Sequence, residues 1–179
     1  MSQASVMDIR LAAERDLPRI VEIYNAAVPS RRSTADTETV TPESRREWFH
    51  RHEPQRRPLL VGEDQGDIVA WMSFEDFYGR PAYAHTAELS IYIAPEYQGR
   101  LLGKRLLQRA EALAPSLDIH TLVGYLFAHN TPSLRLLRAS GYQEWGRLLD
   151  VARMDGRDYS LCIMGKRLEG APAPLEAPD

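Results

Sequence analysis

The spacing of hydrophobic residues changes along the chain, and each spacing predicts one kind of element. In residues 14–28 apolar side chains recur at helical intervals, with Asp16 as a candidate N-cap. Residues 41–52 predict a second helix, in which Thr41 is the cap and Pro42 takes the first helical position. The first third of the chain is therefore mainly helical.

Runs rich in β-branched and aromatic residues predict strands over residues 8–12, 58–63, 67–78, 84–94 and 119–127, and two more within 144–168. Further helices are predicted over residues 102–114 and 130–141. The order predicts an α+β domain, of mixed α/β character, on one mostly antiparallel sheet with a parallel element where helices intervene. We expect a single domain over residues 1–168, with residues 1–6 as a loose leader and an Ala/Pro-rich tail, 169–179, that is disordered.

Composition limits the possible functions of this domain. The chain has 179 residues, a formal net charge of -3 and 44% hydrophobic residues, which is typical of a soluble globular protein. Such a charge gives no overall field to attract nucleic acid. No run of about eighteen apolar residues and no apolar signal core occur, so we expect no membrane span, no export and a cytoplasmic location.

A turn that carries Pro95, Gly99 and Gly103 joins the strand over 84–94 to a basic helix. A turn of this kind leaves backbone amides unpaired at a helix start, where the helix dipole favours an anion. A diphosphate could therefore be held by Gln98, Gly99, Arg100, Gly103 and Lys104. The alternative is that Gly99 serves only the turn, Gly103 only allows close packing, and the basic residues form a solvated helix face.

The turn does not fit the common nucleotide motifs. A P-loop needs one more residue between its glycines than Gly99 and Gly103 provide, and Arg105 stands where the hydroxyl residue should be. The dinucleotide pattern G-x-G-x-x-G is absent as well. Nucleotide hydrolysis and dinucleotide binding are both disfavoured.

The run P-x-x-Q-G-R-x-x-G-K-x-L-L, with the later N-x-P-S before a helix that ends in Gly-Tyr, resembles the GNAT acyl-CoA N-acyltransferases. IYNAAV, STADTE, TAELSIYI and HNTPSLRL are similar to the phosphinothricin and methionine sulfoximine acetyltransferases, over roughly residues 8–168. The resemblance implies a GNAT-like fold with a parallel strand pair at the acyl-CoA cleft, and acetyl-CoA as cosubstrate. The coenzyme-binding residues that it implies are Ile91, Ile93, Gln98, Gly99, Arg100, Leu101, Leu102, Gly103, Lys104, Asn130 and Ser133. Leu101 stands where the family motif has its first glycine.

Glu88 is the candidate base. An alkylammonium with a pKa of about 10.4 cannot attack a thioester until it loses a proton. Strand alternation gives a polar face of Thr86, Glu88, Ser90 and Tyr92 and an apolar face of Ala87, Leu89, Ile91 and Ile93. Taken alone, Glu88 would be a solvated strand carboxylate, but the resemblance implies that it is the general base, because the family has its base in the motif E-x-S-x-Y.

Two other catalytic groups follow from the resemblance. It implies an oxyanion donor in the backbone around Ile91 to Ile93. Many relatives have a Tyr or His acid seven residues after the motif asparagine, where this chain has Leu137. Tyr125, His129 and solvent remain open as the acid. Cys162, the only cysteine, lies in a strand-like run and is interpreted as a buried hydrophobe, so a direct transfer is favoured.

The segment before the Glu88 strand supplies the candidate substrate residues Phe74, Tyr78, Arg80 and Tyr83. Arginine suits a carboxylate by bidentate pairing and aromatic rings can wall a small pocket, although Arg80 could equally be a surface residue in a turn. Secondary candidates are Thr34, Arg31 and Arg32. The resemblance implies a small zwitterionic amino acid or analogue as substrate, and a homodimer with loops that cross near the site.

The sequence therefore favours an acetyl-CoA-dependent N-acetyltransferase that acts on the α-amine of a small amino acid, without a metal. Two alternatives stay open. One is acetylation of protein N-termini or of an antibiotic amine. The other, prompted by Leu101 and Leu137, is a non-catalytic acyl-CoA-binding module.

Overall fold

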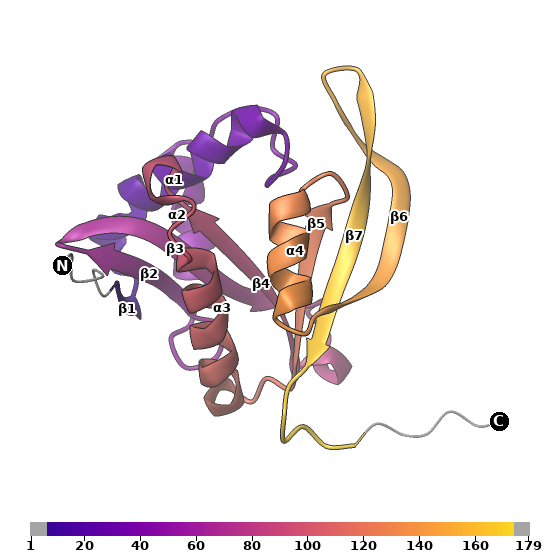
Figure 1. The fold of residues 1–179 in the computed structure, drawn as a ribbon. Coiled ribbons are helices and arrows are strands. Elements are labelled where there is room, and N and C mark those ends of the chain that lie inside the picture. Colours follow the sequence, from indigo (N-terminus) through magenta and orange to yellow (C-terminus); the bar gives the residue numbers. More distant parts are fainter. Residues whose placement is uncertain (1–6, 174–179) are drawn as a thin grey trace, which may run out of the picture.

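Seven strands form one sheet in the order β1-β2-β3-β4-β5-β7-β6 in the computed structural model, which describes residues 7–173 (Figure 1). The strands are β1 (Asp8–Leu11), β2 (Leu59–Asp64), β3 (Asp67–Asp76), β4 (Thr86–Ile93), β5 (Thr121–Phe127), β6 (Gln143–Met154) and β7 (Arg157–Arg167). All neighbouring pairs are antiparallel except β4 and β5, which are parallel. The predicted α+β fold is confirmed. The leader 1–6, and residues 174–179 of the predicted tail, lie outside the described residues.

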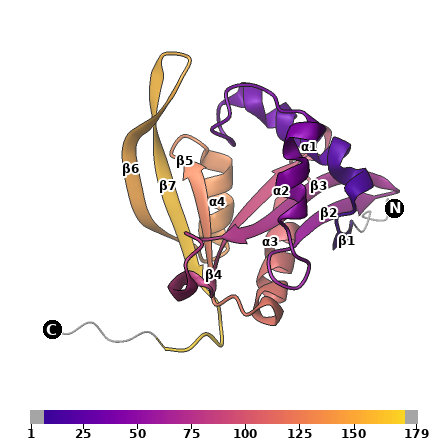
Figure 2. The same ribbon diagram turned by 180° about the vertical axis from the view of Figure 1, so that it is seen from behind.

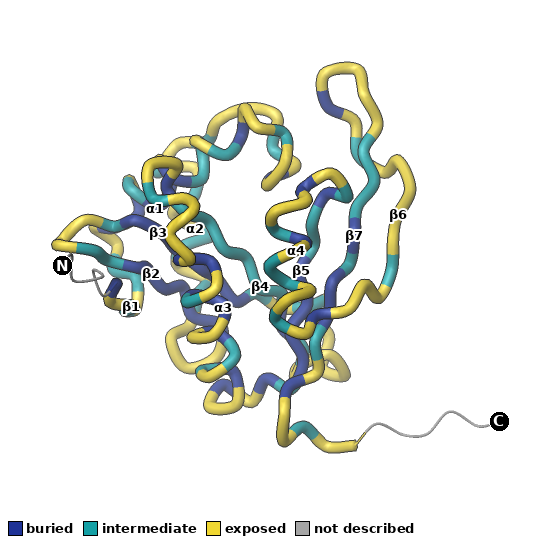
Figure 3. Tube along the Cα trace, viewed as in Figure 1, coloured by how far each residue is buried: buried dark blue, intermediate teal, exposed yellow. Residues whose placement is uncertain are grey.

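Helices cover both faces of the sheet (Figures 1 and 2). The α-helices within residues 7–173 are α1 (Leu17–Ala27), α2 (Pro42–His50), α3 (Leu102–Leu113) and α4 (Thr131–Ala139). The same part of the chain contains the short 3-10 helices η1 (Glu14–Asp16), η2 (Val28–Ser30), η3 (Pro81–Tyr83), η4 (Pro95–Tyr97) and η5 (Ala114–Leu117). Apolar residues of α1 and α2 pack on one face of the sheet, and those of α3 and α4 pack on the other. Buried stretches follow β2, β3 and β5 and one side of α1 and α3, whereas most of β4 is intermediate (Figure 3).

The parallel pair opens after a short contact. Its register is Thr86↔Thr121, Ala87↔Leu122 and Glu88↔Val123, and no later pair of these two strands is formed among the described residues. β4 continues beside β3, whereas β5 continues beside β7. The two halves of the sheet therefore diverge, as Figures 1 and 2 show. Glu88 is in the last residue pair before the two strands separate.

Local sequence signals explain most element ends. The Thr41 Oγ1 accepts a hydrogen bond from the Ser44 backbone N at 3.1 Å, so the predicted cap of α2 is confirmed. Asp155 and Gly156 both have positive φ (50° and 76°), as a mirror-image hairpin turn requires. Asp16 does not cap α1 with its side chain. Its carboxylate instead accepts from the Ala13 backbone N, and from Arg10 at 2.6 Å.

The structure also bears on the interpretation of Cys162 and on the search for membrane-spanning helices. Cys162 has no exposed surface, as expected of a small core residue. None of the helices within residues 7–173 is long and apolar enough to cross a membrane.

Candidate active site

Strand β4 presents Glu88 to a cavity between the sheet and the two N-terminal helices. The alternation predicted for this strand is observed, because Ala87 is fully buried and Leu89, Ile91 and Ile93 pack against the α3 side of the core. The cavity has a volume of about 170 Å³ and is lined by Ile20, Val21, Tyr24, Val40, Arg45, Trp48, Trp71, Ser73, Glu75, Glu88, Ser90 and Tyr92. Its aromatic walls and the polar groups that converge on it are typical of a site for a small polar molecule.

Burial raises the pKa of Glu88 from 4.5 to about 7, and the charge of Glu75 adds to this effect. Glu75 lies directly opposite Glu88 in the register of β3 and β4. Two carboxylates that share a cavity resist ionising together. A carboxyl group that titrates near neutral pH can accept a proton from an ammonium and release it again.

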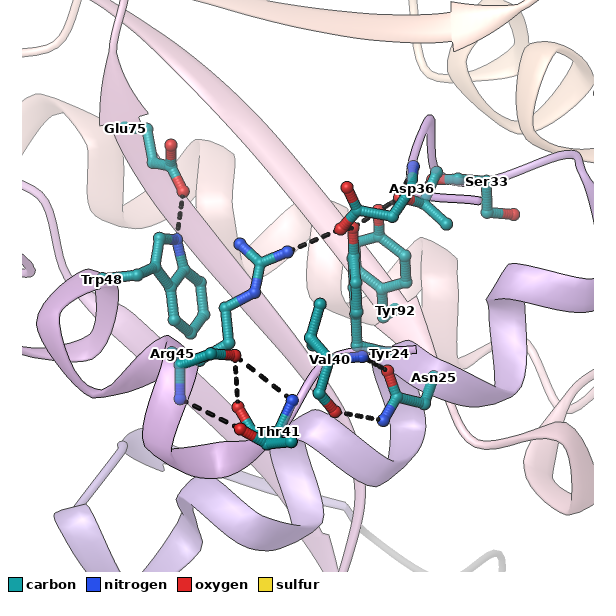
Figure 4. Close-up of polar contacts among 12 residues, drawn as sticks. Tyr24, Asn25, Ser33, Asp36, Val40, Thr41, Arg45, Trp48, Glu75 and Tyr92 are labelled. Carbon is teal, nitrogen blue, oxygen red and sulfur yellow. Dashed lines mark hydrogen bonds and ion pairs between the residues drawn. The ribbon is translucent and has the colours of Figure 1, made fainter. Parts of the chain in front are cut away.

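Glu75 is held by α2 through the indole of Trp48 (Figure 4). The Trp48 Nε1 donates to the Glu75 Oε1 at 2.7 Å. The His52 Nε2 lies 3.8 Å from the same oxygen and, among the described residues, has no hydrogen-bond partner. The Ser73 hydroxyl, in a residue only 1% exposed, also lines the cavity and lacks a partner within residues 7–173. An unpaired buried hydroxyl beside the two carboxylates is available to a ligand.

A polar network ties the loop after α1 to the cavity rim. The Tyr24 hydroxyl donates to the Asp36 carboxylate at 2.5 Å and lies 2.5 Å from the Thr34 Oγ1. Arg45 donates to the same Asp36 carboxylate at 2.6 Å and lies over the Tyr24 ring (Figure 4). Thr34 therefore contacts Tyr24, which lines the cavity, but does not line the cavity itself. Any effect of Thr34 on a substrate would be indirect, through Tyr24 and the loop after α1.

The segment predicted to bind substrate lies elsewhere. Phe74 is fully buried on the opposite face of β3, because residues 71, 73 and 75 are those that alternate toward Glu88, and this corrects its assignment to the pocket wall. Arg80 and Tyr83 line a second hollow, beside Asp76. Tyr78 is 75% exposed. Within one chain, none of these residues reaches the Glu88 cavity.

The turn before α3 presents free backbone amides. Gly99 and Leu101 both have positive φ (77° and 62°), and Leu101 is the N-cap residue of α3. The amides from Gly99 to Lys104 donate no hydrogen bond to any described residue. The Leu101 side chain is 73% exposed, so it does not lie over these amides in a packed position. The residues of the turn therefore fit an anionic group.

The side chains of this turn are mostly tied to the turn itself. The Gln98 Nε2 donates to the Ile93 carbonyl at 3.3 Å, and Arg100 donates to the Glu96 carbonyl. Gly103 allows α3 to pack closely, because a Cβ there would lie 3.0 Å from a Leu136 methyl carbon. Lys104 is exposed and Leu102 is buried. Close packing at Gly103 and free amides in the turn before α3 therefore occur together, so the two interpretations of the glycines do not exclude each other.

Asn130 and Ser133 form the start of α4. The Asn130 Oδ1 accepts from the Ser133 backbone N at 3.4 Å, and its Nδ2 donates to the Arg32 carbonyl at 3.2 Å. The capping role is therefore present, and it links α4 to the loop after α1. Arg31 pairs with Asp155 through two of its guanidinium nitrogens and donates from the third to the Thr37 carbonyl, so all three of its nitrogens already have partners.

The candidates for the acid differ in their surroundings. Leu137 packs against the core, and one of its methyl carbons lies 3.7 Å from where a Gly124 Cβ would be, at the opening of the sheet. His129 is held by the Arg31 carbonyl at 2.7 Å from its Nε2. The pKa of Tyr125 is raised by burial and then by the charge of Glu88. Tyr125 is the candidate that shares an electrostatic environment with Glu88.

Comparison with known proteins agrees with this geometry. Residues 17–142 match the Acetyltransferase (GNAT) family, and the chain therefore belongs to the GNAT acetyltransferases. It is 52% identical to YwnH of Bacillus subtilis, which carries the provisional name phosphinothricin acetyltransferase, over 90% of this chain and 99% of that protein. It is 31% identical to the L-methionine sulfoximine/L-methionine sulfone acetyltransferase of Salmonella typhimurium, over 94% of this chain and 98% of that protein.

A solved structure gives the same result. The structure of yncA from Salmonella typhimurium, provisionally named an acetyltransferase and holding its cofactor acetyl-CoA, superposes with a TM-score of 0.86 at 30% identity. The alignment covers 96% of this chain and 99% of that one. The predicted resemblance to GNAT N-acetyltransferases, and within them to those named for phosphinothricin and methionine sulfoximine, is confirmed.

Several cavity residues were not predicted: Tyr24, Arg45, Trp48, Trp71, Ser73 and Glu75. A signal for the last three was available, since β3 directly precedes β4 in the chain, consecutive strands of an antiparallel sheet commonly pair, and alternate positions of β3 then share the Glu88 face. The residues of α1 and α2 carried no such signal, because the face that a helix turns to a cavity depends on its packing.

Proposed function

We propose that this enzyme acetylates the α-amine of a small amino acid or of an analogue such as phosphinothricin or methionine sulfoximine, by direct transfer from acetyl-CoA. The observation that carries the proposal is a carboxyl group with a raised pKa in a small cavity, at the point where β4 and β5 separate. The names of the relatives support the class of substrate.

The chemistry needs two proton transfers. The substrate nitrogen arrives as an ammonium, loses one proton to Glu88 and attacks the thioester carbon; a C–N bond forms and the C–S bond breaks. The nitrogen loses a second proton as the amide forms. Of the two protons that leave the nitrogen, one is balanced by protonation of the thiolate. The sum is an amide, a thiol and one proton released to water.

Backbone groups would hold the coenzyme. The pyrophosphate would lie on the amides from Gly99 to Lys104, next to Gln98, with Asn130 and Ser133 beside the pantetheine and the backbone of Ile91 to Ile93 facing the thioester oxygen. When bound, the coenzyme supplies the activated acetyl group. The free amides of the turn support this placement.

The cation of the cavity is Arg45, and we propose it in place of Arg80 as the partner of the substrate carboxylate. Arg45 lines the cavity, whereas Arg80 lines the second hollow. One guanidinium nitrogen of Arg45 is used by Asp36, and the fork of an arginine has further donors for a carboxylate.

The predicted homodimer is also kept as a proposal. The edge strand β6 exposes Trp145, Leu148, Leu149 and Val151, which favours contact with a second copy of the chain. Location in the cytoplasm stays a prediction from the sequence.

The experiment is an acetyl-CoA turnover assay with a panel of amines. The panel includes free amino acids, methionine sulfoximine, phosphinothricin, a short peptide and an aminoglycoside. Activity limited to the small amino acids would support the proposal, and preference for the peptide or the aminoglycoside would favour the first alternative. Coenzyme binding by calorimetry with no product from any amine would favour the non-catalytic module.

A further inference from the structure

Two histidines and an aspartate lie together at the closed end of the parallel strand pair, where β4 and β5 begin. His85 directly precedes β4, and Asp118 and His120 precede β5. Each residue offers a ligand atom, and the three atoms lie within 4.8 Å of one another. Within residues 7–173, this is the one group of three or more such residues found close enough to hold a metal ion. None of the three lines the Glu88 cavity.

The backbone holds these residues in place. The backbone N of His120 donates to the His85 carbonyl at 2.8 Å, and the His120 carbonyl accepts from the Leu168 N at 2.8 Å. Ile119, between the two ligands of the second segment, is 1% exposed and anchors that segment in the core. The ligands are therefore presented by two segments that the sheet fixes relative to each other.

The distances suit a small divalent ion. The His120 Nε2 lies 3.4 Å from the Asp118 Oδ1, and the His85 Nδ1 lies 3.2 Å from the Asp118 Oδ2. Ligand atoms at about 2.0–2.1 Å around a tetrahedral zinc are about 3.3–3.4 Å apart. The carboxylate thus already lies at ligand spacing from both rings.

The two imidazole rings are stacked, 8° from parallel with centroids 4.6 Å apart. Both donors can point to one ion only if one ring turns. His85 is free to do so, because its side chain is 53% exposed and its ring contacts, besides the stacked His120 ring, the Asp118 carboxylate and carbonyl. The same His85 Nδ1 also lies 3.0 Å from the Asp118 carbonyl, a contact that it would exchange for the ion when the ring turns.

We propose that His85, Asp118 and His120 form a zinc site that joins the starts of β4 and β5. Two neutral imidazoles and a carboxylate suit zinc, whereas calcium and magnesium prefer oxygen ligands only. The site would stabilise a parallel contact that extends over three residue pairs before the strands separate. It has no part in acetyl transfer, for which we expect no metal.

The test is a titration of the untagged full chain with zinc chloride, followed by calorimetry. The expected result is one zinc per chain and a raised melting temperature. His85→Ala and Asp118→Asn should each weaken zinc binding by about tenfold or more, since even outer-shell changes cost about tenfold to a hundredfold. The matched control is His50→Ala, an exposed histidine near Glu14 on another element, which should leave zinc affinity unchanged.

A second measurement separates loss of the ligand from loss of the fold. Each variant should retain its far-UV circular dichroism and its affinity for coenzyme A, because all three side chains lie outside the cavity and the α3 turn. Zinc binding unaltered in a folded His85→Ala or Asp118→Asn variant would overturn the proposal. So would equal affinity for calcium, or a stoichiometry well below one.

Discussion

Glu75 and Glu88 occupy directly opposed positions on β3 and β4, and both line the same small cavity. Burial and the charge of Glu75 together raise the pKa of Glu88 to about 7. The base proposed for acetyl transfer is thus adjusted by a neighbour on the next strand, and the pair would attract a substrate ammonium.

Replacing Glu75 with glutamine should lower the pKa of Glu88. The folded-state pKa is raised, so removing a like charge lets Glu88 ionise at lower pH, while burial, the larger cause, remains. The acidic limb of the kcat/KM profile should move to lower pH by up to about one unit. Glu47→Gln, an exposed change on α2, is the control and should not move it. An acidic limb that stays in place in Glu75→Gln would show that Glu75 does not influence the base.

Replacing Arg45 with alanine should raise the KM for the amino acid by about tenfold or more, the size expected for loss of a charge-assisted pair. The KM for acetyl-CoA should change little, because Arg45 lies away from the α3 turn. Arg80→Ala is the matched comparison and should have the smaller effect. The reverse order would mean that Arg80 reaches the cavity from a second copy of the chain.

Replacing Leu101 with glycine tests whether this departure from the family motif matters. The position has a positive φ, which glycine adopts without strain, and the leucine side chain is largely in solvent. We expect coenzyme A affinity, measured by calorimetry, to stay within about threefold, which corresponds to less than about 1 kcal/mol. A gain of tenfold or more would show that the leucine obstructs the coenzyme.

Replacing Leu149 with aspartate should separate the proposed homodimer. Leu149 is 72% exposed on the edge strand β6, and a charge in an apolar interface is costly. Sedimentation should show a dimer for the parent and a monomer for the variant. A parent that sediments as a monomer would contradict the dimer, and an unchanged dimer in the variant would exclude β6 as its interface.

The sequence predicted those parts of the site that depend on one segment. The alternation of β4, the cap at Thr41 and the cap at Asn130 are all local patterns, and the structure has them as expected. The prediction for β3 was wrong about which side chains face the cavity. Phe74 lies near Glu88 in the chain, but Ser73 and Glu75 share the face of Glu88, and Phe74 points to the opposite side of the sheet.

Other features depend on long-range packing and gave no local signal. Arg45 reaches the cavity because α2 packs on the Glu88 face of the sheet, and the Asp16 carboxylate accepts from Arg10 and from the Ala13 backbone N in place of capping α1. Neither contact can be predicted from the spacing of residues along the chain. The pairing of Arg31 with Asp155, 124 residues apart, is likewise visible only in the folded chain.

The most direct test of the account is the Glu88→Gln variant, assayed for acetyl-CoA turnover with methionine sulfoximine across the pH range. Glutamine keeps the size of the side chain but cannot accept the proton, so kcat/KM should fall by about 10²–10⁴-fold, while calorimetry gives an unchanged affinity for coenzyme A. Turnover that stays at the parent level at every pH would contradict Glu88 as the base.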